Sequence, residues 1–148
     1  MRRKRRQSGK RLDPLSPGER SDRMSRVRCK DTKLEMLVRR LVHGMGYRYR
    51  LHSRSLPGHP DMVFPGRRKV IFVHGCFWHL HKGCRQYRLP RSKTDFWLPK
   101  LRETKRRDER QYALLREEGW DVMVVWECET KDASALARRI VDFLGGAQ

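Results

Sequence analysis

The chain has 148 residues, a length that suits one domain with a single hydrophobic core. Its 36 Lys and Arg residues outnumber 17 Asp and Glu residues and give a formal net charge of +19, which favours a polyanionic partner such as nucleic acid. No stretch is long and apolar enough to insert into a membrane, so an anionic membrane surface is the weaker candidate partner.

Residues 1–19 are basic and rich in Pro, Gly and Ser, which predicts a disordered tail ahead of a domain over residues 20–148. Residues 1–30 hold twelve Lys and Arg against three acidic residues, so the remaining charge excess lies within the domain. No apolar signal-peptide region follows the first charged residues, which predicts a cytoplasmic protein. Structural disulfides are rare there, so we expect the four Cys residues to be free thiols or metal ligands.

The first strong helical pattern covers residues 34–45, where apolar side chains recur at helical spacing. It predicts an amphipathic helix with Arg39 and Arg40 pointing outward. Thr32 and Glu35 match a capping box at the start of this helix, and this match favours a purely local role for Glu35. In a second interpretation, the Glu35 carboxylate binds a water on a metal ion or orients a catalytic histidine.

The rest of the domain alternates strands and helices. Alternating or apolar runs predict strands over residues 47–51, 61–64, 69–73 and 120–127. We expect a second helix to begin near Thr94 to Pro99 and to run to Glu118, with its regular part starting near Leu98, because Pro99 is tolerated only in a first turn. Its inward side is marked by Leu101, Asp108, Tyr112 and Leu115. A last helix follows Asp132, and the whole order predicts an α/β fold with a mixed sheet flanked by helices.

One stretch, residues 70–84 (VIFVHGCFWHLHKGC), concentrates ligating and stacking groups directly after an apolar strand. Three thiols and one imidazole form a candidate set for structural zinc. The set comprises Cys76, His81, Cys84 and Cys128. His79 is a rival ligand, since its spacing from Cys76 is also common in zinc sites. The plainer alternative is that the cysteines are buried apolar side chains and the histidines lie on the surface.

Asp61 opens the strand before this stretch, and a carboxylate at a strand edge near His74 can hold a hard cation such as Mg²⁺. The ordinary alternative for Asp61 is a turn or cap residue. His79, held rigidly between candidate zinc ligands, could deprotonate an attacking water, and His74 could orient a phosphate or act as a second acid or base.

Two aromatic pairs, Phe77-Trp78 and Phe96-Trp97, stand outside the predicted strands. In a basic setting such side chains can stack on bases or wedge between them. The alternative is a small core around the candidate zinc loop, and we expect one partner of each pair to serve that core.

From about Arg20 to Gly145 the chain resembles the Vsr family of very-short-patch-repair DNA mismatch endonucleases. The matching segments are RSDRMSRVRCKDTKLEMLVRRL, SLPGHPDMVFPG, KVIFVHGCFWHLHKGC, TDFWLPKL, RRDERQYALLREEGW and VVWEC. The resemblance implies a restriction-endonuclease-like fold of the PD-(D/E)XK class with a structural zinc site. It also implies a monomer at the nucleoid, nicking double-stranded DNA 5′ of the thymine in T:G mismatches that arise from 5-methylcytosine deamination. Mismatch-repair or polymerase proteins are possible partners.

The resemblance also assigns roles. Asp61 would be the Mg²⁺ carboxylate, helped by the backbone carbonyl of Val73. His79 would be the general base, with His74 and Glu35 in support. The structural zinc would be bound by Cys76, His81, Cys84 and Cys128.

Contacts with DNA are implied for Phe77, Trp78, Trp97, Met24, Val27, Arg107 and Asp108. The three aromatic residues would wedge into the duplex beside the mismatch from the major groove, and a helix with Met24 and Val27 would lie in the minor groove. Two alternatives are a nuclease of the same fold that cuts other DNA and a catalytically inactive, zinc-stabilised DNA-binding module.

Overall fold

The computed structural model describes residues 16, 18–19, 32–85 and 94–145, and it divides the chain into two units, residues 1–30 and 31–148. In the first unit, the Ser16 N–H donates to the Glu19 carboxylate, and the Glu19 N–H donates to the Ser16 hydroxyl. The predicted disordered tail lies mostly outside the described residues, and the predicted helix with Met24 and Val27 lies wholly outside them.

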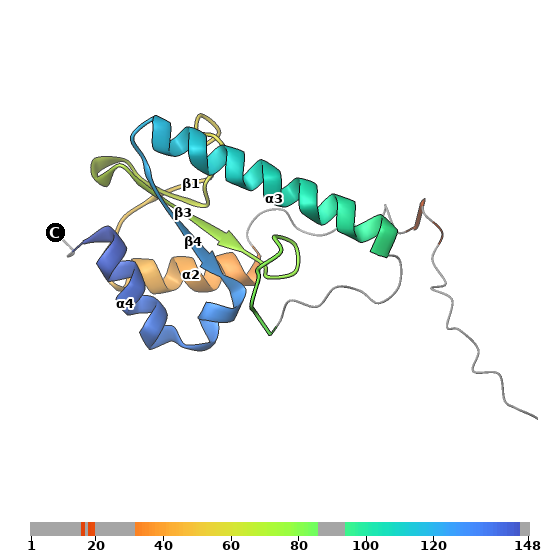
Figure 1. Ribbon diagram of the computed structural model, residues 1–148. Coiled ribbons are helices and arrows are strands. Elements are labelled where there is room, and N and C mark those ends of the chain that lie inside the picture. Colours follow the sequence, from red (N-terminus) through yellow and green to blue (C-terminus); the bar gives the residue numbers. More distant parts are fainter. Residues whose placement is uncertain (1–15, 17, 20–31, 86–93, 146–148) are drawn as a thin grey trace, which may run out of the picture. The chain divides into compact units, whose positions relative to one another are not determined.

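Four strands form one mixed sheet in the second unit (Figure 1). In sheet order they are β1 (Arg50–Leu51), β2 (Met62–Phe64), β3 (Lys69–His74) and β4 (Asp121–Trp126). β2 runs antiparallel to both of its neighbours, β1 and β3, whereas β3 and β4 run parallel. Short 3₁₀ helices follow two strands: η1 (Pro65–Arg67) after β2 and η2 (Glu127–Lys131) after β4.

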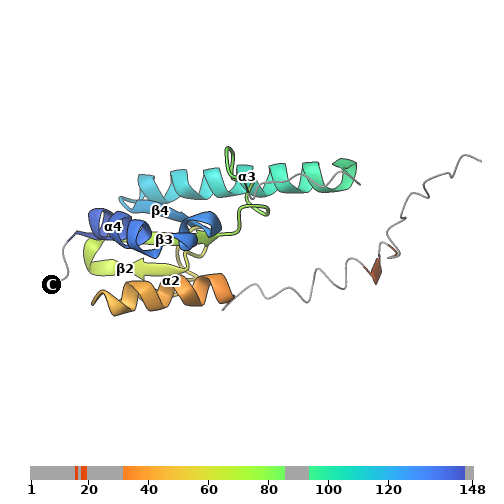
Figure 2. The ribbon, with the colours of Figure 1, turned by 90° about the horizontal axis from the view of Figure 1, so that it is seen from below.

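Three helices cover the sheet, and this confirms the prediction of a mixed sheet flanked by helices. They are α2 (Lys33–Gly44), α3 (Thr94–Glu117) and α4 (Ala133–Leu144). α2 and α4 pack on one face and α3 packs on the other, an arrangement that Figure 2 shows from below. Within the part of the chain that the structure describes, no helix has both the length and the apolar character needed to cross a membrane.

The alternation of side chains along β3 builds a separate core on each face of the sheet. Ile71 belongs to the core under α2 and α4, whereas Val70 and Phe72 belong to the core under α3. Residues 70–74 are therefore all buried, because helices cover the strand from both sides. This double burial explains why the strand reads as a continuous apolar run in the sequence.

α3 begins at Thr94, within the range predicted for its start, but its regular part begins before the predicted Leu98 and therefore contains Pro99. Pro99 has no N–H to donate to the carbonyl of Asp95, so the early turn forms without that hydrogen bond. The Trp97 ring in this turn contacts Phe77 and Trp78, with ring centroids 5.8 Å from each. These aromatic contacts stabilise a turn that local propensity alone does not predict.

Two further predictions were wrong. β1 spans only two residues, because it is an edge strand that pairs with the short β2. Arg39 is buried instead of pointing outward, since its guanidinium lies 3.0 Å from the carboxylate of Glu35 one turn earlier. Arg40 is exposed, as predicted.

Candidate functional site

The directions of the strands bring the candidate site residues together at one edge of the sheet. β3 and β4 are parallel, so their carboxyl ends meet at that edge, and the chain continues there into the loop over residues 75–85 and into η2. β2 is antiparallel to β3, so Asp61, directly before β2, lies at the same edge. Residues far apart in sequence, such as Asp61 and Cys128, are thereby brought to one end of the fold.

The Asp61 carboxylate is held by the neighbouring strand, since it accepts the Val73 N–H at 2.6 Å. Burial, helped by the nearby Glu35 carboxylate and opposed by the hydrogen bond from the Val73 N–H, raises the pKa of Asp61 to about 6. In an extended strand the N–H and C=O of one residue point to the same side, so the Val73 carbonyl also faces the Asp61 side. This set of oxygen atoms suits a hard divalent cation.

Two further side chains lie beside Asp61. One ligand atom each from Glu35, His52 and Asp61 lies within 4.8 Å of the others. Thr32 accepts the Glu35 N–H in a helix cap at 3.2 Å, while the Glu35 carboxylate is buried near Asp61. The helix cap by Thr32 is therefore confirmed, whereas a role of the Glu35 carboxylate in binding a metal-bound water or orienting a catalytic histidine stays a prediction. The Arg39 guanidinium lies 2.7 Å from Nε2 of His52, which makes that nitrogen an acceptor because Arg only donates.

His79 pairs with a carboxylate from α3. Its Nδ1 lies 2.6 Å from the Asp108 carboxylate, and its ring stacks on His74 with centroids 3.6 Å apart. Nε2 of His74 contacts the Tyr112 hydroxyl, and burial, with His79 nearby, lowers the pKa of His74 to about 3. A neutral His74 thus packs against a His79 whose Nδ1 proton is bound to a carboxylate, an arrangement that leaves Nε2 of His79 able to accept a proton.

His81 belongs to a different cluster from His79. One ligand atom each from Cys76, His81, Cys84 and Cys128 lies within 4.8 Å of the others, and Nδ1 of His81 is 3.5 Å from the sulfurs of Cys76 and Cys128. Tetrahedral bonds of about 2.3 Å to sulfur and 2.0–2.1 Å to nitrogen would separate these atoms by about 3.6 Å. The donor set therefore fits one zinc ion.

Burial raises the pKa of Cys76 to about 12 and raises the pKa of Cys128 as well. Thiols in such surroundings become thiolates when a cation binds them. The His81 ring also stacks on Trp126, with ring centroids 4.1 Å apart, and this contact fixes the plane of the imidazole at the end of β4.

Phe77, Trp78, Phe96 and Trp97 form one aromatic cluster between the loop over residues 75–85 and the start of α3. Trp78 is 38% exposed and Phe96 is 44% exposed, whereas Phe77 and Trp97 are half-buried. One partner of each sequence pair thus supports the cluster, and the other faces solvent.

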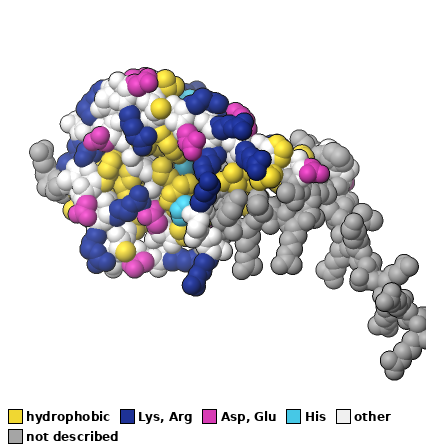
Figure 3. Space-filling view, viewed as in Figure 1, with side chains coloured by type: hydrophobic (Ala, Val, Ile, Leu, Met, Phe, Trp, Pro, Cys, Tyr) yellow, Lys and Arg dark blue, Asp and Glu magenta, His cyan; other side chains and the backbone are white. Residues whose placement is uncertain are grey.

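Basic side chains gather along α3 beside this cluster (Figure 3). The exposed ones on α3 are Lys100, Arg102, Arg106, Arg107, Arg110 and Arg116. Arg107 is therefore available to a partner, but Asp108 is buried and bonded to His79. The predicted DNA contact of Asp108 stays a prediction, and its observed contact supports a role in positioning His79.

Sequence reasoning missed His52, Tyr112 and Trp126 as members of the site. Tyr112 stands four residues after Asp108 on the inward side of α3, and a polar pair at that spacing on a buried helix face was an available signal. His52 and Trp126 gave no such signal, because their partners Arg39 and His81 are distant in sequence.

The model of a protein family described as DNA mismatch endonuclease Vsr matches residues 12–86. The chain is 53% identical over 132 residues to the type II nicking enzyme V.XorIIP of Xanthomonas oryzae pv. oryzae, covering 89% of this chain and 96% of that protein. It is 39% identical over 132 residues to the DNA mismatch endonuclease Vsr of Escherichia coli, covering 86% of this chain and 84% of that protein. It is also 38% identical to the type II nicking enzyme V.NmeAIP of Neisseria meningitidis over 86% of this chain and 91% of that protein.

Proposed function

The chain belongs to the Vsr family and is a DNA-cleaving endonuclease, and from this premise we propose that it nicks double-stranded DNA 5′ of the thymine in T:G mismatches. The observation that carries the proposal is the placement of the Asp61 carboxylate, the His79–Asp108 pair and an exposed aromatic cluster at one end of the sheet. These groups supply a cation ligand, a general base and a surface for bases.

In the proposed reaction, His79 takes a proton from the water that attacks the phosphate. Asp108 holds the Nδ1 proton of His79 and orients its ring, and the stacked, neutral His74 restricts the ring from one face. Asp61 and the carbonyl of Val73 would hold Mg²⁺, which supplies charge stabilisation at the phosphate being cut. Glu35 lies beside Asp61 and would orient a water bound to that cation.

A structural zinc held by Cys76, His81, Cys84 and Cys128 would order the loop that carries His79 and Trp78. This role fits a loop that follows a strand end and contributes few residues to either core. We further propose a restriction-endonuclease-like fold, a monomeric enzyme and a disordered basic segment over residues 1–19, located in the cytoplasm with the nucleoid.

Cleavage of matched and mismatched DNA tests the function directly. A T:G duplex and its T:A control are incubated with the protein, with and without Mg²⁺, and the strands are separated on a denaturing gel. We expect one strand of the T:G duplex to be nicked, and only with Mg²⁺. Equal cutting of both duplexes would contradict mismatch specificity, and binding without cutting would favour an inactive DNA-binding module.

Asp108→Asn should lower the rate of nicking by about 10²- to 10⁴-fold, because His79 loses the carboxylate that fixes its tautomer and its orientation. DNA affinity should change little. Single-turnover cleavage measures the effect, and Glu103→Gln, an exposed carboxylate on the same helix, is the matched control that should keep full activity. An Asp108→Asn variant as fast as the wild type would exclude the pair from the mechanism.

Trp78→Ala should reduce the preference for T:G over T:A more than it reduces overall affinity. Phosphate contacts supply most of the sequence-independent affinity, whereas base–aromatic stacking is worth about 1–3 kcal/mol per base. Dissociation constants on both duplexes measure the ratio. Leu114→Ala, an exposed apolar residue elsewhere on α3, is the control. Equal losses on both duplexes would argue against the aromatic wedge.

A further inference from the structure

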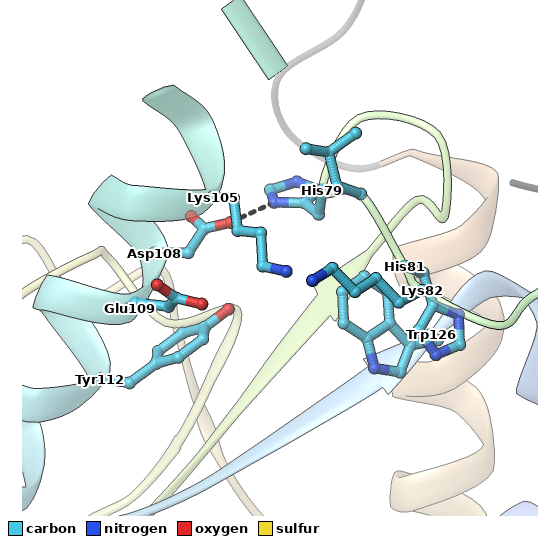
Figure 4. A pocket seen from close by; sticks show the side chains of 9 residues that line it. His79, His81, Lys82, Lys105, Asp108, Glu109, Tyr112 and Trp126 are labelled. Carbon is cyan, nitrogen blue, oxygen red and sulfur yellow. Dashed lines mark hydrogen bonds and ion pairs between the residues drawn. The ribbon is translucent and has the colours of Figure 1, made fainter. Parts of the chain in front are cut away.

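A hollow of ≈ 230 Å³ opens between α3 and the loop over residues 75–85, directly beside His79. Its volume is several times the roughly 30 Å³ that one water occupies in the liquid, so it can hold more than a single solvent molecule. Figure 4 shows the side chains that line it, which come from α3, from the loop and from the end of β4. The proposed reaction uses only the His79 and Asp108 side of this hollow.

Two ammonium groups converge on the hollow from different elements. Lys82 reaches in from the loop and Lys105 from α3, and their amino ends turn toward one another across the opening (Figure 4). Among residues 32–85 and 94–145, neither lysine forms an ion pair with a carboxylate. Two ammonium groups that face each other repel, and an anion between them would offset this repulsion.

Two carboxylates, Asp108 and Glu109, also line the hollow, and their negative charge opposes an anion there. The Asp108 carboxylate is already bonded to His79, and Glu109 is exposed at the rim. Leu80 and the rings of Tyr112 and Trp126 also line the hollow, so apolar surface lies in the same hollow as the two ammonium groups. A sugar–phosphate unit matches both features, because it joins an anion to apolar C–H groups.

We propose that Lys82 and Lys105 bind a phosphate group in this hollow, and that the phosphate belongs to the DNA strand being cut, next to the scissile position. The location rests on the proposed function, because His79 lines the hollow and would also serve the reacting phosphate. Each ammonium group offers three donors to the phosphate oxygens. Free inorganic phosphate carries the same charged oxygen atoms and is the alternative occupant of the hollow.

The salt dependence of DNA binding tests the subsite without requiring cleavage. Wild type, Lys82→Met, Lys105→Met and the double variant are titrated with duplex at several salt concentrations without added divalent cation. One phosphate held by both lysines contributes about 0.9 to the slope of log K against log[salt]. We expect the double variant to lose about that amount, whereas two independent phosphate contacts would remove about twice as much.

Neutral methylphosphonate groups, placed one at a time along the cleaved strand, identify the phosphate. At one position beside the cut, the substitution should weaken binding of the wild type and have no further effect on the double variant. Lys131→Met, on η2, is the matched control and should keep the full wild-type response. Glu109→Gln, which removes a negative charge from the rim, should strengthen binding.

Inorganic phosphate at constant ionic strength tests the alternative occupant. A rise in the melting temperature of the wild type but not of the double variant, with no coupled DNA position, would assign the hollow to free phosphate. The absence of both a coupled position and a phosphate-dependent rise would overturn the proposal. The same titrations are also run on the matched T:A duplex. A protein without T:G preference would then still show whether the two lysines bind a DNA phosphate.

Discussion

Asp61→Asn should abolish DNA cleavage while the protein stays folded and still binds DNA. A bound metal ion supplies several kcal/mol of transition-state stabilisation, and each 1.36 kcal/mol is tenfold in rate, so a loss of more than about 10³-fold is expected. The amide oxygen of Asn can still accept the Val73 N–H that Asp61 accepts at 2.6 Å, so the strand end should keep its geometry. DNA contacts should survive, because the side chain is chiefly a cation ligand in the proposed mechanism.

The same substitution should stabilise the protein at neutral pH when no divalent cation is added. Burial raises the pKa of Asp61 to about 6, so the folded state binds this proton more tightly than the unfolded chain does. The wild type therefore loses stability as the pH rises from about 4 to about 6, and Asn at this position does not titrate. The low pKa of His74 makes both proteins less stable as the pH falls below its ordinary value of about 6.5, and this shared effect cancels in the comparison.

Melting temperatures at pH 4, 6 and 7.5 measure this difference, which should be near zero at pH 4 and favour the variant at pH 7.5. Asp142→Asn, an exposed carboxylate on α4, is the control and should behave as the wild type at every pH. Retained cleavage by Asp61→Asn would remove this residue from the proposed active site. A variant less stable than the wild type at pH 7.5 would contradict the burial argument.

Cys128→Ser should lower the melting temperature by about 10 °C or more and abolish the zinc binding proposed for the four-ligand set. The residue joins the end of β4 to the loop over residues 75–85, and structural zinc sites contribute directly to folding free energy. For a chain of this size each kcal/mol corresponds to roughly 2–8 °C, so a loss of several kcal/mol gives a shift of that order. Nicking should also fall, because the loop carries His79.

Zinc content by mass spectrometry, read together with the melting temperature, separates a metal site from a packed cysteine. Cys29→Ser, outside the four-ligand set, should keep one zinc per chain and an unchanged melting temperature. A strong chelator should destabilise the wild type and leave Cys128→Ser, already without zinc, nearly unaffected. Full zinc content in Cys128→Ser would show that this thiol is not a ligand.

The sequence predicted two kinds of candidate site residue: those that lie close together along the chain, and those that stand at the end of a strand. The grouping of Cys76, His81 and Cys84 depends on one short loop, and Asp61 was found from its position at the start of a strand. The fourth cysteine follows β4, and parallel pairing of β3 with β4 brings it to the same edge.

Other features depend on contacts that no local pattern contains. Helical periodicity placed Arg39 on the outer face, but a buried ion pair with Glu35 and a contact with His52 hold it inside. The link between His74 and Tyr112 spans 38 residues and exists only because α3 packs over β3. Propensity likewise failed at Pro99, where aromatic contacts of Trp97 stabilise the early turn of the helix.

The single uninterrupted helix α3 carries Trp97 near its start and Asp108 eleven residues later. At 1.5 Å of rise per residue these positions are about 16 Å apart along the helix axis, and Pro99 lies between them. If Trp97 meets the mismatch, a base pair that tilts the start of the helix also moves the carboxylate that aims His79. Mismatch recognition and catalysis would then be coupled through α3. A duplex that binds poorly to Trp97 would leave His79 misaligned and would be released uncut. In the proposed mechanism, the fidelity of cleavage would then depend on the stiffness of α3 as well as on the bases that the protein contacts.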